Sequence, residues 1–255
     1  MSSHRIGLLV PSSNTTMETE VPEVLRRVAA ATGEQFTFHS ARMRMKTVEP
    51  SQLAAMNADA DRATAELADA AVDVMAYACL VAIMSAGPGA HREIESRLTC
   101  IAAETDDPID VVSSAGALVE GLHHLGVKKT AIITPYVKSL TAQVVDYIEA
   151  EGIEVQDAIS LEVDDNLAVG RLDPTQLPGI ARNLDTRGVD AVVLSACVQM
   201  PSLPALPAAE KALGLPVITA ATATSWKILQ ILGLTALADG AGALFRGGDS
   251  PSKES

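Results

Sequence analysis

Hydrophobic and polar positions follow two alternating patterns along the chain. Short apolar runs rich in Val and Ile are separated by longer amphipathic stretches. The amphipathic stretches predict helices, among them Ser51–Ala71, Leu140–Glu151 and Pro174–Arg187. The short runs predict strands over Arg5–Val10, Gln35–Arg42, Val72–Ala78, Ile109–Ser113, Thr130–Thr134, Glu154–Leu161, Val189–Ala196 and Val217–Thr219. Alternation of this kind is typical of parallel sheets joined by right-handed crossovers.

Three short motifs recur in the same order in the two halves of the sequence. They are an apolar strand that stops at proline, an Asp-led strand that ends in Ala-Cys, and a proline-led strand. The pairs are Ile6–Pro11 with Ala131–Pro135, Val72–Cys79 with Val189–Cys197, and Pro108–Ser114 with Pro216–Ala221. Since all three matches keep their order, they indicate a duplicated unit.

The predicted fold class is therefore α/β, with two similar open parallel-sheet halves related by pseudo-twofold symmetry. We expect residues 1–112 to form the first half, completed by a C-terminal helix over 220–246, and residues 113–219 to form the second. The tail 247–255 is rich in Gly, Ser and charge and is predicted to be disordered. Ligands bind beyond the carboxyl ends of the strands in open α/β sheets, so two related halves would share one cleft.

Composition and charge exclude several classes of partner. Aromatic residues make up only 3% of the chain, so the core must be built from Ala, Val, Leu and Ile. The net charge of −13 and the absence of a basic stretch argue against nucleic acids and anionic membranes. No signal peptide or membrane-spanning run is visible. Three cysteines, an odd number, favour free thiols in a reducing, cytoplasmic location. The sequence contains no CxxC pair, no HExxH motif and no clustered His, so we expect no metal site.

Two of the cysteines end equivalent predicted strands of the repeat. Cys79 and Cys197 each precede a segment that could begin a helix, where unpaired backbone N–H groups and the helix dipole favour a thiolate and can bind a carboxylate. A buried free cysteine is also a common small core residue. The repetition of the pair favours chemistry over packing. Cys100 has no counterpart in the second half and is interpreted as structural.

Three polar residues follow strands at the same edge. Asn14 lies between the first strand and the first helix, Tyr136 lies at the corresponding point of the second half, and Asn166 follows the second strand of that half. We expect them to face the cleft. The alternatives are a helix cap for Asn14, a rim residue for Tyr136 and a turn residue for Asn166.

Paired strand-end cysteines in duplicated halves resemble the Asp/Glu racemase superfamily. The segments Tyr77–Ala82, Leu194–Leu203 and Pro11–Thr16 look like those of the maleate cis-trans isomerase family. The resemblance extends over nearly the whole chain apart from the tail. It implies a cofactor-independent enzyme for a small dicarboxylate, acting as a homodimer.

The same resemblance implies roles for individual residues. Cys79 would be the nucleophile and Cys197 its acid/base partner, and Asn14, Tyr136 and Asn166 would contact substrate. Amino-acid racemases of the superfamily usually carry Asn-Thr after the first cysteine and Thr after the second. Here the residues expected beside the substrate are Leu80, Val81 and Val198. Arylmalonate decarboxylases keep only the second cysteine, and Cys79 argues against that activity.

Three functional hypotheses follow. The first is isomerisation of maleate to fumarate through a succinyl-cysteine-like adduct on Cys79, because adding a thiolate converts the double bond to a single bond that can rotate. The alternative is a two-cysteine racemase of an acidic amino acid or a hydantoin. The third is a non-catalytic solute-binding protein, which would give no reason for paired cysteines.

Overall fold

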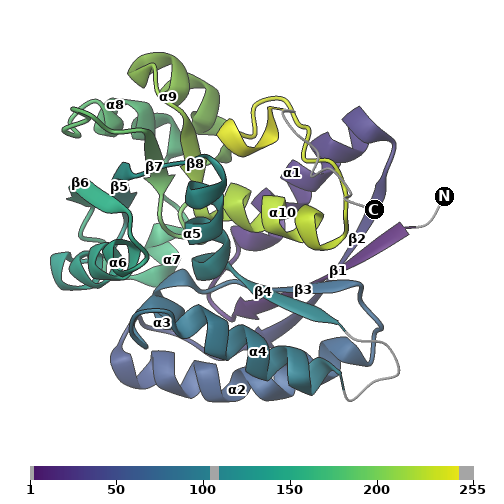
Figure 1. Cartoon of the computed structure of the whole chain (residues 1–255). Coiled ribbons are helices and arrows are strands. Elements are labelled where there is room, and N and C mark those ends of the chain that lie inside the picture. The colour runs from purple at the N-terminus through teal and green to yellow at the C-terminus, as the bar shows by residue number, and fades with distance from the viewer. Residues whose placement is uncertain (1–2, 104–108, 247–255) are drawn as a thin grey trace.

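The eight strands form two parallel sheets of four strands each in the computed structural model, which describes residues 3–103 and 109–246 (Figure 1). The first sheet has the order β2-β1-β3-β4, and the second has the order β6-β5-β7-β8. The first contains β1 (Ser3–Pro11), β2 (Gln35–Met43), β3 (Val74–Tyr77) and β4 (Asp110–Ser113). The second contains β5 (Lys129–Thr134), β6 (Glu154–Ser160), β7 (Ala191–Ser195) and β8 (Val217–Thr219). The identical strand order confirms the predicted fold class, and each predicted strand is present.

The repeated Asp has a structural explanation at the start of the third strand of each half. Asp73 accepts a hydrogen bond from the backbone N–H of Arg5 at 2.6 Å. Asp190 likewise accepts from the backbone N–H groups of Lys128 at 2.8 Å and Lys129 at 2.9 Å. Each carboxylate therefore ties the entry of one strand to the entry of its neighbour, which fixes the register of the parallel pair.

Helices cover the sheets as the alternating pattern requires (Figure 1). They are α1 (Met17–Thr32), α2 (Pro50–Ala68), α3 (Leu80–Met84), α4 (Ala90–Ala102), α5 (Ser114–His124), α6 (Lys138–Ala150), α7 (Asn166–Val169), α8 (Leu177–Ala181), α9 (Leu206–Leu213) and α10 (Ala220–Ile231), with 3-10 turns η1 (Pro174–Gln176), η2 (Leu203–Ala205) and η3 (Ala243–Phe245). Helices α2 and α4 pack on the first sheet from one side, and α1 and α10 pack on it from the other.

Two of the three predicted helices hold, and the third is broken. The predictions for Ser51–Ala71 and Leu140–Glu151 correspond to α2 and α6. The prediction for Pro174–Arg187 is wrong, because η1 and the five-residue α8 replace one long helix. Beyond α8, the backbone N–H of Asp185 donates to Asp157 at 2.8 Å instead of continuing a helical ladder.

Helix α10 packs against α1, α5, β3 and β4. It is buried nearly all round, and its hydroxyls are satisfied within the helix, since Thr224 donates to the carbonyl of Ala220 at 2.7 Å and Ser225 donates to that of Ala221 at 2.9 Å. The predicted helix over 220–246 is shorter than expected. It ends at Ile231, and the chain from there to Arg246 forms an irregular segment that includes η3.

Some sequence predictions fall on residues that the structure does not describe. The tail 247–255 and Pro108 of the third repeat motif lie outside the described residues. Among the helices that are described, we find none with the length and apolar character needed to cross a membrane.

Candidate active site

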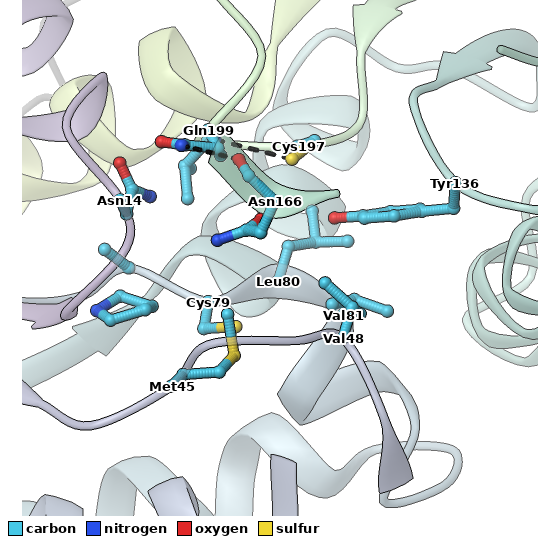
Figure 2. A pocket seen from close by; sticks show the side chains of 13 residues that line it. Asn14, Met45, Val48, Cys79, Leu80, Val81, Tyr136, Asn166, Cys197 and Gln199 are labelled. Atoms are coloured by element: carbon cyan, nitrogen blue, oxygen red, sulfur yellow. Dashed lines mark hydrogen bonds between the residues drawn. The ribbon is translucent and has the colours of Figure 1, made fainter. Parts of the chain in front are cut away.

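A small cavity lies where the carboxyl ends of both sheets meet (Figure 2). Its volume is about 20 Å³, roughly the room that one water molecule needs. The residues lining it come from both halves: Pro11, Asn14, Met45, Val48, Ala78, Cys79, Leu80, Val81, Tyr136, Asn166, Cys197, Val198 and Gln199. The structure therefore brings together all eight residues that the sequence singled out for the site.

Cys79 sits at the junction between β3 and α3. The backbone N–H of Ala78 donates to the carbonyl of Leu9 at 2.9 Å, which holds the end of β3 beside β1. The chain then turns into α3, with Cys79 as its N-cap residue, as predicted. The side chain is only 5% exposed. Burial raises the pKa of the Cys79 thiol to about 12, with a smaller contribution from nearby Cys197, while a hydrogen bond from the backbone of Ala82 opposes the rise.

Cys197 occupies the equivalent position after β7. The backbone N–H of Ala196 donates to the carbonyl of Ile133 at 2.9 Å, the counterpart of the bond at Ala78. The helix predicted after Cys197 is absent, and the chain instead turns tightly over residues 198–200. This turn aims backbone N–H groups at the sulfur. The N–H of Gln199 donates to Sγ at 3.4 Å, and the hydroxyl of Tyr136 donates to the same sulfur.

The expectation that both cysteines favour the thiolate is wrong, because burial shifts both pKa values upwards. Burial raises the pKa of Cys197 as well, although hydrogen bonds from Tyr136, Gln199 and Met200 oppose that rise. The sequence argument counted the hydrogen-bond donors but not the loss of water around the sulfur. Burial favours the neutral thiol of both cysteines, so a proton must leave before a nucleophile forms.

Asn14 combines the two interpretations that its position allowed. Its Oδ1 accepts hydrogen bonds from the backbone N–H groups of Thr16 at 3.0 Å and Met17 at 3.1 Å, so it caps the start of α1. Within the described residues its Nδ2 has no hydrogen-bond partner, and the side chain lines the cavity. The cap fixes the amide so that its N–H groups are available to a ligand.

Asn166 and Tyr136 approach the cavity from the second half (Figure 2). Asn166 is the first residue of α7, and its Nδ2 donates to the hydroxyl of Ser13 at 2.6 Å. Tyr136 is 5% exposed, and burial raises the pKa of its hydroxyl well above the usual range. It therefore remains a hydrogen-bond donor at any physiological pH.

The remaining lining is apolar and includes residues that sequence reasoning missed. Leu80, Val81 and Val198 face the cavity as expected, while Met45, Val48 and Gln199 were not singled out. The sequence repeat could have predicted Met45 and Val48 as lining residues, because they follow β2 just as Asn166 follows β6. Among the residues that the structure describes, no Lys, Arg, Asp or Glu lines the cavity.

Glu20 anchors the chain that follows Cys197. This α1 residue is buried, and its carboxylate accepts hydrogen bonds from the backbone N–H groups of Ser202 at 2.6 Å and Leu203 at 2.7 Å, and from the Ser202 hydroxyl at 3.1 Å. Burial raises the pKa of Glu20, and these hydrogen bonds oppose the rise. A helix of the first half thus holds a cysteine-bearing loop of the second half.

Cys100 lies far from this chemistry. It is exposed on α4 and does not line the cavity. Within the described ranges, no group of three or more His, Cys, Asp or Glu side chains could hold a metal ion.

Two parallel-sheet halves that bring one cysteine each to a shared cavity define an α/β enzyme of the Asp/Glu racemase-like class. The model of the arylmalonate decarboxylase family matches residues 6–245. The chain is 56% identical to a maleate isomerase from Pseudomonas putida, over 96% of this chain and 98% of that protein. The chain therefore belongs to the family that this model describes, and within it to the maleate isomerases.

Solved structures agree with that assignment. The maleate isomerase Iso from Pseudomonas putida S16 superimposes with a TM-score of 0.95 at 52% identity, covering 96% of this chain and 99% of that one. A Nocardia farcinica maleate cis-trans isomerase superimposes with a TM-score of 0.93 at 49% identity, covering 97% of this chain and 100% of that one. That protein is a Cys-to-Ser mutant with a covalently bound succinylcysteine intermediate.

Proposed function

We propose that this protein converts maleate to fumarate without a cofactor, through a covalent adduct on Cys79 with Cys197 as acid/base partner. One observation carries the proposal: a buried thiol from each half lines a single cavity whose other polar groups are neutral hydrogen-bond donors and acceptors. The maleate isomerases at 49–56% identity support the substrate, and the succinylcysteine intermediate of the Nocardia protein supports the adduct.

The chemical problem is rotation about a carbon–carbon double bond. Cys79 first releases its thiol proton to solvent. The resulting thiolate adds to one alkene carbon, and the π electrons pass to the second carbon and its carboxylate. Cys197 gives its thiol proton to that second carbon, which leaves a succinyl group on Cys79 and a thiolate on Cys197. The central carbon–carbon bond is now single and can rotate.

The second half of the cycle restores both cysteines. After rotation, the Cys197 thiolate removes a proton from the carbon that it protonated. The double bond re-forms in the trans geometry as the carbon–sulfur bond breaks. Fumarate leaves, Cys79 is again a thiolate, and Cys197 is again a thiol, so no electron or proton is consumed.

Neutral groups hold the two carboxylates in this proposal. The free Nδ2 of Asn14 and the Tyr136 hydroxyl can donate to carboxylate oxygens, with Asn166 between them (Figure 2). Hydrogen bonds to the developing negative charge are strong in a cavity closed to water. An uncharged lining also lets that charge move between the carboxylate and the two sulfurs without a fixed ion pair trapping it.

The racemase alternative has less support from the residues around the sulfurs. Paired thiols suit a two-base proton exchange equally well. The side chains of Leu80, Val81 and Val198 are apolar, however, and offer nothing to a substrate ammonium group. Burying an ammonium against such a wall would be costly.

Proton NMR of maleate with the purified, reduced protein tests the proposal. Appearance of the fumarate signal is the expected result. Aspartate and glutamate in deuterated water provide the comparison, and deuterium uptake at their α-carbon without fumarate formation would favour the racemase. Ligand binding with neither reaction would overturn both activities.

The organisation of the protein is part of the proposal. We place residues 1–112 with 220–246 in one half and 113–219 in the other, since α10 packs on β3, β4 and α1. The free thiols of Cys79, Cys100 and Cys197 support a reducing, cytoplasmic location. A homodimer is expected from the family resemblance, and light scattering after gel filtration tests it.

A further inference from the structure

The side-chain amide of Gln199 is fully used by the protein around it. Its Oε1 accepts hydrogen bonds from the backbone N–H groups of Thr15 at 3.0 Å and Thr16 at 3.4 Å. Its Nε2 donates to the carbonyls of Ser13 at 3.0 Å and Asn166 at 2.9 Å. A primary amide offers two donors and two acceptor sites, and all four are occupied here. The residue is 3% exposed, so water cannot replace these bonds.

These four bonds join loops that come from different halves. Ser13, Thr15 and Thr16 flank Asn14 in the loop between β1 and α1, whereas Asn166 begins α7 in the second half. Figure 2 shows Gln199 above the cavity, between Asn14 and Cys197. One side chain therefore sets the separation of the two asparagines that we propose as substrate contacts.

The main chain of the same residue reaches the reactive sulfur. The Gln199 N–H donates to Cys197 Sγ at 3.4 Å. Movement of the Gln199 side chain would pull on this N–H, because only the residue's own bonds separate the two ends. The placement of Asn14, Asn166 and the Cys197 sulfur is thereby coupled.

Gly170 provides the room for this amide. A Cβ atom at Gly170 would lie 2.6 Å from Gln199 Nε2. The backbone of Gly170 is ordinary right-handed helical, with φ −67° and ψ −9°, so alanine could adopt it without strain. Glycine at position 170 therefore leaves space for the Gln199 amide, and its conformational freedom is not required there.

We propose that Gln199 is the positioning residue of this site: its amide locks the loops of Asn14, Asn166 and Cys197 into one arrangement. It acts through those residues and has no free amide hydrogen to offer a substrate. The kinetic test of this inference rests on the proposed function. The hydrogen bonds from which the inference is argued do not depend on that function.

The primary test compares Gln199→Met with Gln199→Glu. Methionine has a similar length but makes none of the four bonds, and we expect kcat/KM to fall by about 10- to 100-fold with KM raised, in a protein that still folds. In Gln199→Glu, an ionised carboxylate would face the carbonyls of Ser13 and Asn166, whereas the protonated acid can donate to one of them. We therefore expect its activity relative to the wild type to rise as the pH is lowered from 8 to 6.

A purely structural role predicts a different result. Both variants would then lose thermal stability, while kcat/KM per folded molecule stayed near that of the wild type at every pH. That result would overturn the proposal. Gly170→Ala is the independent variant, since it displaces the amide without changing it, and we expect the same direction of effect on KM.

Labelling with iodoacetamide separates this inference from the proposed function. In Gln199→Met we expect the labelling rate of Cys197 to differ at least about tenfold from that of the wild type, because both the N–H that reaches its sulfur and the packing around it are displaced, with exposed Cys100 as the internal reference. If the wild type does not isomerise maleate, the function fails, yet the labelling still tests the positioning role. Unchanged Cys197 labelling in folded Gln199→Met and Gly170→Ala would overturn the inference.

Discussion

Cys79 and Cys197 occupy the same point of the duplicated fold, but different polar groups surround their sulfurs. Among the described residues, Cys79 receives the backbone N–H of Ala82. Cys197 Sγ accepts a hydrogen bond from the backbone N–H of Gln199 at 3.4 Å, and Tyr136 and the backbone of Met200 also oppose the rise of its pKa. Burial raises the pKa of both thiols, yet the opposing hydrogen bonds are more numerous at Cys197. A thiolate is therefore better supported in the second half than in the first.

The difference arises in the loops and not in the strands. After β3 the chain enters α3 directly, and most of its first N–H groups point along the helix. After β7 it forms a tight turn, and the backbone N–H of Gln199 in that turn donates to the sulfur at 3.4 Å. The nucleophilicity of a thiolate increases with its pKa, so the less stabilised sulfur is the stronger nucleophile once ionised. Because this gain is smaller than the loss in thiolate fraction, the assignment of addition to Cys79 rests on the family resemblance and not on the pKa asymmetry.

Replacing Cys79 should have the largest effect. We expect Cys79→Ser to reduce isomerisation by more than about 10²-fold without loss of the fold, because a serine hydroxyl ionises far less readily. Fumarate formation followed by NMR measures the effect. The matched control is Cys100→Ser on exposed α4, which should keep full activity. Retention of more than a few per cent of activity by Cys79→Ser would refute its role as nucleophile.

Replacing Cys197 should stop the cycle at a different point. In Cys197→Ser we expect addition to proceed and turnover to fall strongly, since the group that exchanges the proton at the second carbon is missing. Intact-protein mass spectrometry should then show an added mass of one maleic acid molecule on Cys79. An adduct on Cys197 in Cys79→Ser, with none on Cys79 here, would exchange the two roles.

Most of the fold could be predicted from the amino-acid sequence because each half repeats the same local sequence pattern. The strand led by Asp73 and the strand led by Asp190 are both apolar, both begin with the same carboxylate clamp and both end in Ala-Cys. Such local signals locate the strands and hence the cavity edge. The position of Cys79 and Cys197 followed from them directly.

Contacts between the halves could not be predicted in the same way. Gln199 and Glu20 are ordinary polar residues in the sequence, and their role depends on partners about 180 positions away. The direction of the cysteine pKa shifts was missed for a similar reason, because both sulfurs are buried in a cavity whose lining comes from both halves. The broken helix at Pro174–Arg187 likewise reflects a contact with Asp157 that no local pattern contains.

Removing the Tyr136 hydroxyl should have an intermediate effect on isomerase activity, because it changes the surroundings of Cys197. The hydroxyl opposes the rise of the Cys197 pKa, so Tyr136→Phe should raise that pKa further. We expect kcat to fall about tenfold or more, in keeping with loss of one hydrogen bond to a charged group. Labelling of Cys197 by iodoacetamide should also require a higher pH, while Cys79 labelling changes less. An unchanged pH profile for Cys197 would show that the hydroxyl serves substrate binding alone.

The smallest effect is expected from Asp73 and Asp190, the two aspartates that bind backbone N–H groups at the amino ends of the strands. Asp190 accepts two backbone N–H groups, at 2.8 and 2.9 Å, whereas Asp73 accepts one at 2.6 Å. Asp190→Asn should therefore cost more stability than Asp73→Asn, on the order of 1 kcal/mol at pH 7. Both variants should keep full isomerase activity, because these aspartates precede their strands and the cavity lies at the carboxyl ends.

The pH dependence of this effect has a defined sign. Hydrogen bonds from the backbone of Lys128 and Lys129 hold the pKa of Asp190 below its usual value. The folded protein therefore binds this proton less readily than the unfolded chain does, and the stabilisation is present above the unfolded pKa of about 3.9. It is lost as the pH falls through the lower folded value. Urea unfolding at pH 7 and near pH 3 should thus show the gap between the wild type and Asp190→Asn narrowing in acid, and a gap that stays constant would mean that the charge of Asp190 does not strengthen the clamp.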